Sequence, residues 1–423
     1  FMQKYDLIIV GAGAAGMLAA IQANAEAPQL RIALLERLPR PGKKLLATGN
    51  GRCNIANAAA SREHYYNAAG QNPAFVQPAL QKYTQQDNLA FFRSMGLLTK
   101  QEAEGKMYPL GDQAVAVLDT LRLQLAARQL ALICEAEVRQ IEQTGGGWQL
   151  RLADGRLLHA RALLLAMGGL ASPQLSHSQG FADLLAPLGL KTTRLYPALT
   201  QLKCNSPLPK ALQGIKFNGR AVLWQADELL AEAEGEILFA AYGLSGPPIL
   251  QLSRWAARNF YANSQAAAQE IQLDLLPQMS RAELLAELSA RRALPLLLED
   301  FLTGLLNKRL GQQLLKLLPG ERKLSAPAGS LTEADLAALA ALIKALPLAV
   351  CGVTGWERAQ VMAGGLELKG FESQTLAARR LPGLFAAGEL LDVCGDCGGY
   401  NLSWAWSSGR LAAHSAVQYL LSD

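Results

Sequence analysis

Three glycines near the N-terminus have the spacing of a dinucleotide-binding turn. The stretch Gly11-Ala-Gly13-Ala-Ala-Gly16 matches the pattern G-x-G-x-x-G. In that pattern the first glycine makes a tight turn, the second lets the backbone approach a pyrophosphate, and the third allows a helix to pack closely on a strand. The start of the helix that follows would present free N–H groups and a partial positive charge to the phosphates. The spacing therefore predicts a phosphate-binding turn.

The residues around this turn predict the elements that must position it. Residues 5–10 are a short apolar run typical of a strand buried on both faces. Residues 17–27 are rich in alanine and favour a helix, and residues 31–35 predict a second strand. Glu36 follows that strand 20 residues after Gly16, where a carboxylate can accept hydrogen bonds from a ribose. The strand, glycines, helix, second strand and acid in register favour dinucleotide binding; the alternative is a Gly/Ala-rich tight turn without a ligand.

The segment after Glu36 favours FAD over a nicotinamide nucleotide as the resident cofactor. Residues 42–54 are rich in Gly, Asn, Lys and Arg and have no hydrophobic period. A nicotinamide dehydrogenase would usually continue into another strand and helix, whereas an irregular segment can wrap an extended ligand. The sequence contains no second G-x-G-x-x-G. We therefore expect NADH or NADPH, if used, to bind only transiently as the reductant.

The C-terminal region predicts the other half of the cofactor site. The apolar run 381–386 leads into Gly388-Glu389 and then Asp392. Further on, Gly398-Gly399 precede a predicted helix over 402–421. The partial positive charge at the start of that helix would stabilise a reduced, negatively charged flavin. The alternative is a helix cap beside a tight turn, without a flavin. We expect both ends of the chain to hold one FAD.

Between the two ends, the pattern changes twice. Residues 138–159 have the alternation of a β-meander, and residues 162–166 predict a buried strand that ends at Met167-Gly168-Gly169. Short strand-like pieces broken by Pro and Gly over 196–277 suggest a small barrel, and a 3.6-residue period over 281–346 suggests helices. The predicted domains are 1–195 and 348–423 for the cofactor domain, 196–278 for the barrel and 279–347 for the helical subdomain.

Composition limits the remaining possibilities. The 423 residues are 50% hydrophobic and 18% charged, which excludes a disordered chain and suggests several domains. There is no uninterrupted apolar run of membrane-spanning length and no signal-like segment, so we expect a cytoplasmic protein without a membrane anchor. Six scattered cysteines do not form a disulfide framework, and four histidines are not spaced as metal ligands. Composition does not predict the oligomeric state.

Four segments resemble the signatures of a known family. They are residues 42–54 (Gly-Lys-Lys-Leu-Leu-Ala-Thr-Gly-Asn-Gly-Arg-Cys-Asn), 243–247, 363–365 and 398–408. Together they are similar to the BaiN-like FAD-dependent oxidoreductases, the aminoacetone-oxidase-like flavoproteins. The resemblance implies an α/β fold: a glutathione-reductase-type FAD-binding Rossmann domain with an inserted β-barrel and a helical subdomain. Cys394 departs from the family's pattern, so its Cys-Gly-Asp-Cys motif is not a family signature.

The resemblance also implies a range of activities. Members of this family are assigned to reduction of conjugated C=C bonds in bile-acid intermediates, to amine oxidation and to dihydrouridine formation in ribosomal RNA. We expect NAD(P)H-linked reduction of a conjugated C=C bond in a small molecule. The alternatives are flavin-dependent reduction of uridine in ribosomal RNA, and amine oxidation. The RNA alternative is motivated by the net charge of +5 and by basic residues of the insert, namely Lys203, Lys210, Lys216, Arg220, Arg254 and Arg258.

Carried over position by position, the resemblance implies a set of FAD contacts in both ends of the chain, with the backbone of Val138 at the adenine. The other positions are Gly11, Gly13, Ala14, Ala15, Gly16, Glu36, Arg37, Lys44, Asn50, Gly51, Arg52, Cys53, Asn54, Gly168, Gly388, Glu389, Asp392, Gly399, Tyr400, Asn401 and Leu402.

Reduction of a C=C bond also needs a proton donor. Cys53 and Tyr400 are the catalytic candidates, although packing or a flavin hydrogen bond explains either residue as well. Cys394 and Cys397 have the spacing of a redox-active dithiol, but chance or packing is the favoured interpretation. His177 lies in a predicted loop near the cleft, where a surface histidine without a role is favoured.

Overall fold

The computed structural model describes residues 3–176, 180–262 and 267–422. The chain divides into two compact units. The first contains residues 1–198 and 359–423, and the second contains residues 199–358. Among the described residues, the model contains no helix whose length and hydrophobicity would let it cross a lipid bilayer. Whether the second unit consists of separate barrel and helical domains stays a prediction.

A seven-stranded sheet forms the centre of the first unit. Strands β1, β2, β7 and β19 run parallel to their neighbours, and β8 and β9 form an antiparallel meander that joins β10. The predicted strand–helix–strand unit and the meander are confirmed. The strand order is β7 (Ala131–Ile133), β2 (Ile32–Leu35), β1 (Gln3–Val10), β10 (Leu157–Leu165), β9 (Gly147–Leu152) and β8 (Val138–Thr144), with β19 (Leu384–Ala386) also beside β10.

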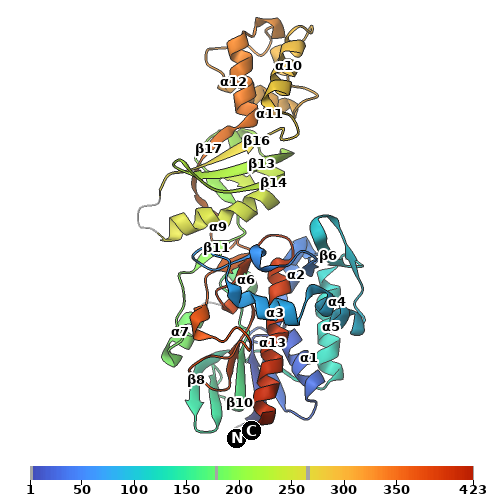
Figure 1. Ribbon diagram of the computed structural model, residues 1–423, viewed down its shortest axis with the longest axis vertical. Coiled ribbons are helices and arrows are strands. Elements are labelled where there is room, and N and C mark those ends of the chain that lie inside the picture. Colours follow the sequence, from blue (N-terminus) through green and yellow to red (C-terminus); the bar gives the residue numbers. More distant parts are fainter. Residues whose placement is uncertain (1–2, 177–179, 263–266, 423) are drawn as a thin grey trace. The chain divides into compact units, whose positions relative to one another are not determined.

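Two helices from opposite ends of the sequence pack side by side against this sheet. They are α1 (Ala14–Glu26), drawn in blue in Figure 1, and α13 (Tyr400–Ser422), drawn in red. Gly409 permits the close approach, because a Cβ there would lie 2.6 Å from the carbonyl oxygen of Ala15. The start of α1 is therefore fixed by the C-terminal helix, as the prediction of a two-ended site requires.

Smaller elements complete the first unit. The remaining helices are α2 (Lys43–Ala47), α3 (Gln77–Lys82), α4 (Gln85–Ser94), α5 (Ala114–Ala127), α6 (Pro173–Ser176) and α7 (Phe181–Leu185). The short strands are β3 (Ala56–Asn57), β4 (Tyr65–Tyr66), β5 (Thr99–Gln101), β6 (Lys106–Pro109), β11 (Tyr196–Ala198), β18 (Val361–Ala363) and β20 (Cys394–Gly395). Strand β20 pairs with β4, so a C-terminal loop is fixed to the segment that follows residue 54.

The second unit contains a closed six-stranded barrel. Two predicted strand pieces merge into β13, and the predicted domain boundary at 347/348 falls inside β17, whose alternating burial suits a barrel strand. The barrel order is β12 (Leu202–Cys204), β15 (Gly243–Ser245), β14 (Glu228–Ala240), β13 (Lys216–Gln225), β16 (Gln269–Asp274) and β17 (Leu346–Val353).

The helices of this unit follow the predicted period with two differences. Helix α9 lies in the region where the sequence predicts only strands of a small barrel. The 3.6-residue period also predicts one helix over 296–318, and this prediction is wrong: Leu298–Asp300 form a 3₁₀ turn, and the side chain of Asn307 caps a shorter helix. The helices are α8 (Leu208–Ala211), α9 (Pro247–Ala262), α10 (Arg281–Arg292), α11 (Lys308–Leu317) and α12 (Glu333–Lys344).

Candidate cofactor-binding site

A pocket of about 550 Å³ lies in the first unit, along the end of the parallel sheet. Its lining begins at the glycine turn and at the end of β2, and it ends at the first turn of α13. Thirteen of the predicted cofactor residues line it: Gly11, Gly13, Ala14, Ala15, Glu36, Arg37, Lys44, Val138, Gly168, Gly388, Glu389, Asn401 and Leu402. Segments separated by more than 350 residues thus contribute to one cavity.

The three glycines of the turn differ in what surrounds them. Gly11 has a φ of +105°, and a Cβ there would lie 2.4 Å from the oxygen of Ala166 on the neighbouring strand. A Cβ on Gly16 would lie 1.9 Å from the oxygen of Gly11, so only glycine allows the helix to begin here. A Cβ on Gly13 would meet nothing within 4 Å. Gly11 and Gly16 shape the turn, and Gly13 leaves space in the pocket.

Glu36 is oriented by the backbone at the end of β2. Its carboxylate accepts hydrogen bonds from the backbone N–H of Leu38 at 2.9 Å and of Ala12 at 3.3 Å. Burial raises the pKa of the Glu36 carboxyl above its ordinary value, while these two hydrogen bonds oppose the shift. Val138 lines the same region. The arrangement provides a fixed acceptor beside an apolar wall, as an adenosine requires.

The opposite end of the pocket offers a cation and an amide. The ammonium of Lys44 lies 2.8 Å from Glu389, which also accepts a hydrogen bond of 2.7 Å from the backbone N–H of Met362. The side chain of Asn401 accepts from the N–H of Gly395 at 2.8 Å and donates to its oxygen at 3.0 Å. Asn401 therefore fixes the loop before α13, whose first N–H groups have no partner within the helix.

The other predicted cofactor residues do not line this pocket. Arg52 forms ion pairs with Glu102 and Asp112 and lies 4.0 Å above the ring of Tyr108. Cys53 is fully buried, and the amide oxygen of Asn54 accepts from the N–H of Met107 at 3.2 Å. The contacts with FAD of these residues stay predictions, as do those of the others outside the lining: Gly16, Asn50, Gly51, Asp392, Gly399 and Tyr400.

Asp392 and Cys394 are buried, and Cys397 is half-buried. The carboxylate of Asp392 accepts from the N–H of Ala68 at 2.8 Å, and burial raises its pKa to about 6. Cys394 and Cys397 are not joined by a disulfide, and burial raises the pKa of Cys397 to about 11. A thiol with a raised pKa is a poor redox nucleophile. His177 lies outside the described residues.

Several lining residues were missed by the sequence analysis. Phe181 and Leu184 come from α7, Gln360 precedes β18, and Trp404 is on α13. Phe181, Leu184 and Gln360 belong to no motif, whereas Trp404 lies in the signature segment 398–408. Thr48 and Gly169 adjoin predicted positions, so a wider interpretation of the same motifs would have included them.

The donor set and the shape of this pocket fit FAD. The pocket's volume is in the range of cofactor sites. The open space at Gly13 faces the first turn of α1, where unpaired N–H groups favour a pyrophosphate. Among the residues that the structure describes, no group of His, Cys, Asp and Glu could hold a metal ion.

Comparison with known proteins extends these observations. Residues 5–415 match the family model described as the HI0933-like protein Rossmann domain. The chain is 35% identical over 414 residues to a 3-dehydro-bile acid delta(4,6)-reductase of Clostridium scindens, covering 97% of this chain and 98% of the relative. It is 30% identical to a ribosomal RNA dihydrouridine synthase of Escherichia coli, covering 98% and 99%. A quinol–fumarate reductase shares the fold, with a TM-score of 0.51 and 16% identity over all of this chain and 72% of the reductase.

Proposed function

Because the chain belongs to the HI0933-like family and is an FAD-dependent oxidoreductase, we propose that it reduces a C=C bond conjugated to a carbonyl group in a small molecule. NADH or NADPH would serve as a transient reductant. The observation that carries the proposal is the similarity to a C=C reductase over nearly the whole chain. The pocket supplies independent support, since residues from both ends of the chain line it.

The described residues would hold FAD in a definite order. Gly13 and the first N–H groups of α1 would bind the pyrophosphate, and Glu36 would accept hydrogen bonds from the adenosine ribose. Lys44 and Asn401 would border the flavin ring. When bound, FAD supplies two-electron hydride chemistry. The unpaired N–H groups at the start of α13 would favour a reduced, anionic ring.

Uridine in ribosomal RNA is the second candidate substrate. It is favoured by the similarity to the rRNA dihydrouridine synthase of Escherichia coli. The chemistry is shared, because a uracil also presents a C=C bond conjugated to a carbonyl. The two candidates therefore differ in how the substrate is bound and not in how it is reduced.

The charged residues of the second unit favour a small-molecule substrate over RNA. RNA binding needs clustered Lys and Arg that are free to meet phosphates. Residues 199–358 contain 16 Lys and Arg and 15 Asp and Glu. Lys216 pairs with Glu236 at 2.8 Å, and Arg220 pairs with Glu232 across the same two strands. Arg254 is only 1% exposed. Three of the six basic residues that motivated an RNA partner are thus neutralised or buried.

Single-turnover kinetics can separate the two substrates. The FAD-loaded protein would be reduced anaerobically with NADPH and mixed either with a 3-oxo steroid acid carrying double bonds at positions 4 and 6, or with unmodified ribosomal RNA. Reoxidation by the steroid and none by RNA supports the small-molecule proposal. Reoxidation only by RNA, in a reaction that weakens as salt rises, supports the second candidate. If neither substrate reoxidises the reduced protein, and an amine reduces the oxidised protein instead, both candidate substrates are overturned.

A further inference from the structure

Reduction of a conjugated C=C bond needs a proton donor as well as a hydride donor. The hydride brings both electrons to one carbon, and the neighbouring carbon must receive a proton. This inference rests on the proposed function. Of the two donors predicted from the sequence, Cys53 is fully buried, and burial raises its pKa to about 12. Tyr400 is 7% exposed, and burial raises its pKa as well.

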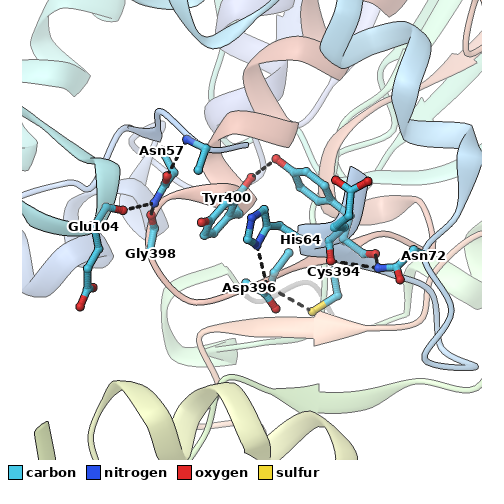
Figure 2. A network of polar contacts seen from close by, with 12 residues as sticks. Asn57, His64, Asn72, Glu104, Cys394, Asp396, Gly398 and Tyr400 are labelled. Atoms are coloured by element: carbon cyan, nitrogen blue, oxygen red, sulfur yellow. Dashed lines mark hydrogen bonds and ion pairs between the residues drawn. The ribbon is translucent and has the colours of Figure 1, made fainter. Parts of the chain in front are cut away.

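A histidine–carboxylate pair lies next to Tyr400. The Nδ1 of His64 is 3.0 Å from the carboxylate of Asp396, and the N–H of Asp396 donates to the oxygen of His64 at 2.9 Å. Figure 2 shows the imidazole pointing toward Asp396 and lying against the ring of Tyr400. The two ring centroids are 4.4 Å apart with an interplanar angle of 24°. The ring of His64 is thus held on one edge and on one face.

The free edge of this imidazole makes it a candidate donor. The side chain of His64 is 33% exposed, whereas that of Asp396 is 9% exposed. Within the described part of the chain, no residue forms a hydrogen bond with Nε2 of His64. An imidazole whose Nδ1–H donates to a buried carboxylate leaves its Nε2 on the side away from that carboxylate. This is the usual orientation of a catalytic imidazole.

The same loop connects this pair to the pocket. Asn401 lines the pocket, and its amide group donates to the backbone oxygens of Gly395 at 3.0 Å and of Asp396 at 3.1 Å. Tyr400, which stacks on His64, is the neighbour of Asn401 at the start of α13. Strand β20, just before Asp396, pairs with β4, just after His64. One rigid loop therefore holds both the flavin end of the pocket and the His64–Asp396 pair.

We propose that His64 is the general acid of the reaction and that Asp396 is its positioning residue. The Nε2–H bond of the imidazolium breaks as a C–H bond forms at the substrate carbon next to the carbonyl. FAD reduced by a nicotinamide nucleotide would supply the hydride for the other carbon, so that one hydride and one proton together saturate the bond. Water returns the proton to His64.

Other charged groups near His64 set the conditions of the test. On its own 3₁₀ turn lie Arg62 and Glu63, and Asp396 and Tyr400 face it from the C-terminal segment. Glu104 and Lys106 form an ion pair beyond Tyr400, where both interact with the same loop. Asp396 is the only one of these groups that bonds the imidazole among the described residues.

A second histidine–carboxylate pair provides a matched control. His414 on α13 lies 2.9 Å from Glu26 on α1, with side chains 28% and 23% exposed. His64→Gln and His414→Gln therefore remove chemically equal pairs, only one of which adjoins Tyr400. His64→Asn serves as a second variant, and the absorbance of bound FAD and the Tm show that each protein is folded and loaded.

Reoxidation of the NADPH-reduced, FAD-loaded protein tests the proposal. With the 3-oxo-4,6-diene steroid acid, we expect His64→Gln to react at least 100-fold more slowly than wild type. With ferricyanide, which takes electrons without a carbon-bound proton, we expect equal rates. His414→Gln should match wild type with both oxidants. Asp396→Asn should slow the steroid reaction about 10-fold and leave the ferricyanide rate unchanged, because the imidazole loses the carboxylate that orients it.

Labelling of the oxidised, FAD-loaded protein with diethyl pyrocarbonate provides a readout without turnover. The steroid acid should slow carbethoxylation of His64, measured by mass spectrometry, and leave that of His414 unchanged. Equal labelling of His64 with and without the steroid, or steroid reduction by His64→Gln within threefold of wild type, overturns the proposal for His64. A wild-type protein that reduces no conjugated carbonyl compound would instead overturn the proposed function, and this inference with it.

Discussion

Two glycine-rich segments of this chain were expected to hold the same cofactor, and they are built in opposite ways. In the turn over residues 11–16, Gly13 lines the pocket, and a Cβ added there would meet no atom within 4 Å. In the segment over residues 49–54, Cys53 is fully buried, and the half-exposed Arg52 is paired with Glu102 and Asp112. Glycine in the first segment makes room for a ligand. In the second segment, Gly49 and Gly51 have positive φ angles, so glycine there serves the backbone conformation of the turn.

The comparison shows that a glycine-rich motif does not by itself specify a ligand contact. A glycine indicates a ligand contact where its missing Cβ leaves open space next to backbone N–H groups that have no partner within their helix. The glycine turn meets that condition, because it is followed by the N-terminus of a 13-residue helix. Helix α2 after Gly42 has only 5 residues.

The largest expected effect comes from filling the open space at Gly13. We expect Gly13→Val to weaken FAD binding at least 100-fold, equivalent to about 2.7 kcal/mol, because the side chain would occupy the pyrophosphate position. The Tm of the flavin-free protein should hardly change, since no atom lies within 4 Å of the new Cβ. Isothermal titration with FAD measures the affinity. Gly146→Val, at an equally open glycine in a hairpin turn, is the control and should bind FAD normally.

The buried carboxyl of Asp392 should affect stability through pH. Its pKa in the folded protein is about 6, above the ordinary 3.8, so the native state retains a proton that the unfolded state releases. Stability from this group therefore falls as pH rises from about 4 to about 6 and stays lowered above it. We expect Asp392→Asn to gain about 1–3 kcal/mol relative to wild type across that window.

Urea unfolding of the flavin-free protein at pH 4.5 and 7.5, followed by tryptophan fluorescence, measures this gain. Asp227→Asn, at an exposed position on the barrel, should show none. A relative stability of Asp392→Asn that is equal at the two pH values would show that the carboxyl titrates normally in the folded protein.

A smaller effect is expected at Arg52, which sharpens the contrast between the two segments. Its guanidinium is taken up by Glu102, Asp112 and the ring of Tyr108. We expect Arg52→Ala to change the affinity for FAD by less than about threefold, with a modest decrease in Tm. Lys44→Ala, which alters a residue lining the pocket, should weaken FAD binding more than Arg52→Ala does. The reverse order in titrations would place the second segment on the cofactor.

The smallest effect is expected at Cys53. With a pKa of about 12, only about one thiol in a thousand is ionised at pH 9, and the side chain is fully buried. Iodoacetamide should therefore leave Cys53 unmodified in the folded protein while it alkylates the exposed Cys351, as read by mass spectrometry. Prompt alkylation of Cys53 below pH 9 would show that its thiol is accessible and restore it as a candidate proton donor.

The sequence predicts local structure well where each residue's role is set by its neighbours in the chain. The strand–turn–helix unit ending at Glu36 has backbone requirements that only certain residues meet, so its elements and its contribution to the pocket were predictable. The closing strand β17 and helix α9 depend on partners distant in sequence, and their boundaries were missed. The His64–Asp396 pair spans 332 residues, and nothing in either local sequence indicates the other.

A crystal structure of the FAD complex tests the central claim most directly. We predict one FAD in the first unit, with its pyrophosphate over Gly13, its adenosine ribose at Glu36 and its flavin ring between Lys44 and Asn401. Electron density for the flavin outside this pocket, or an adenosine turned away from Glu36, would contradict the account.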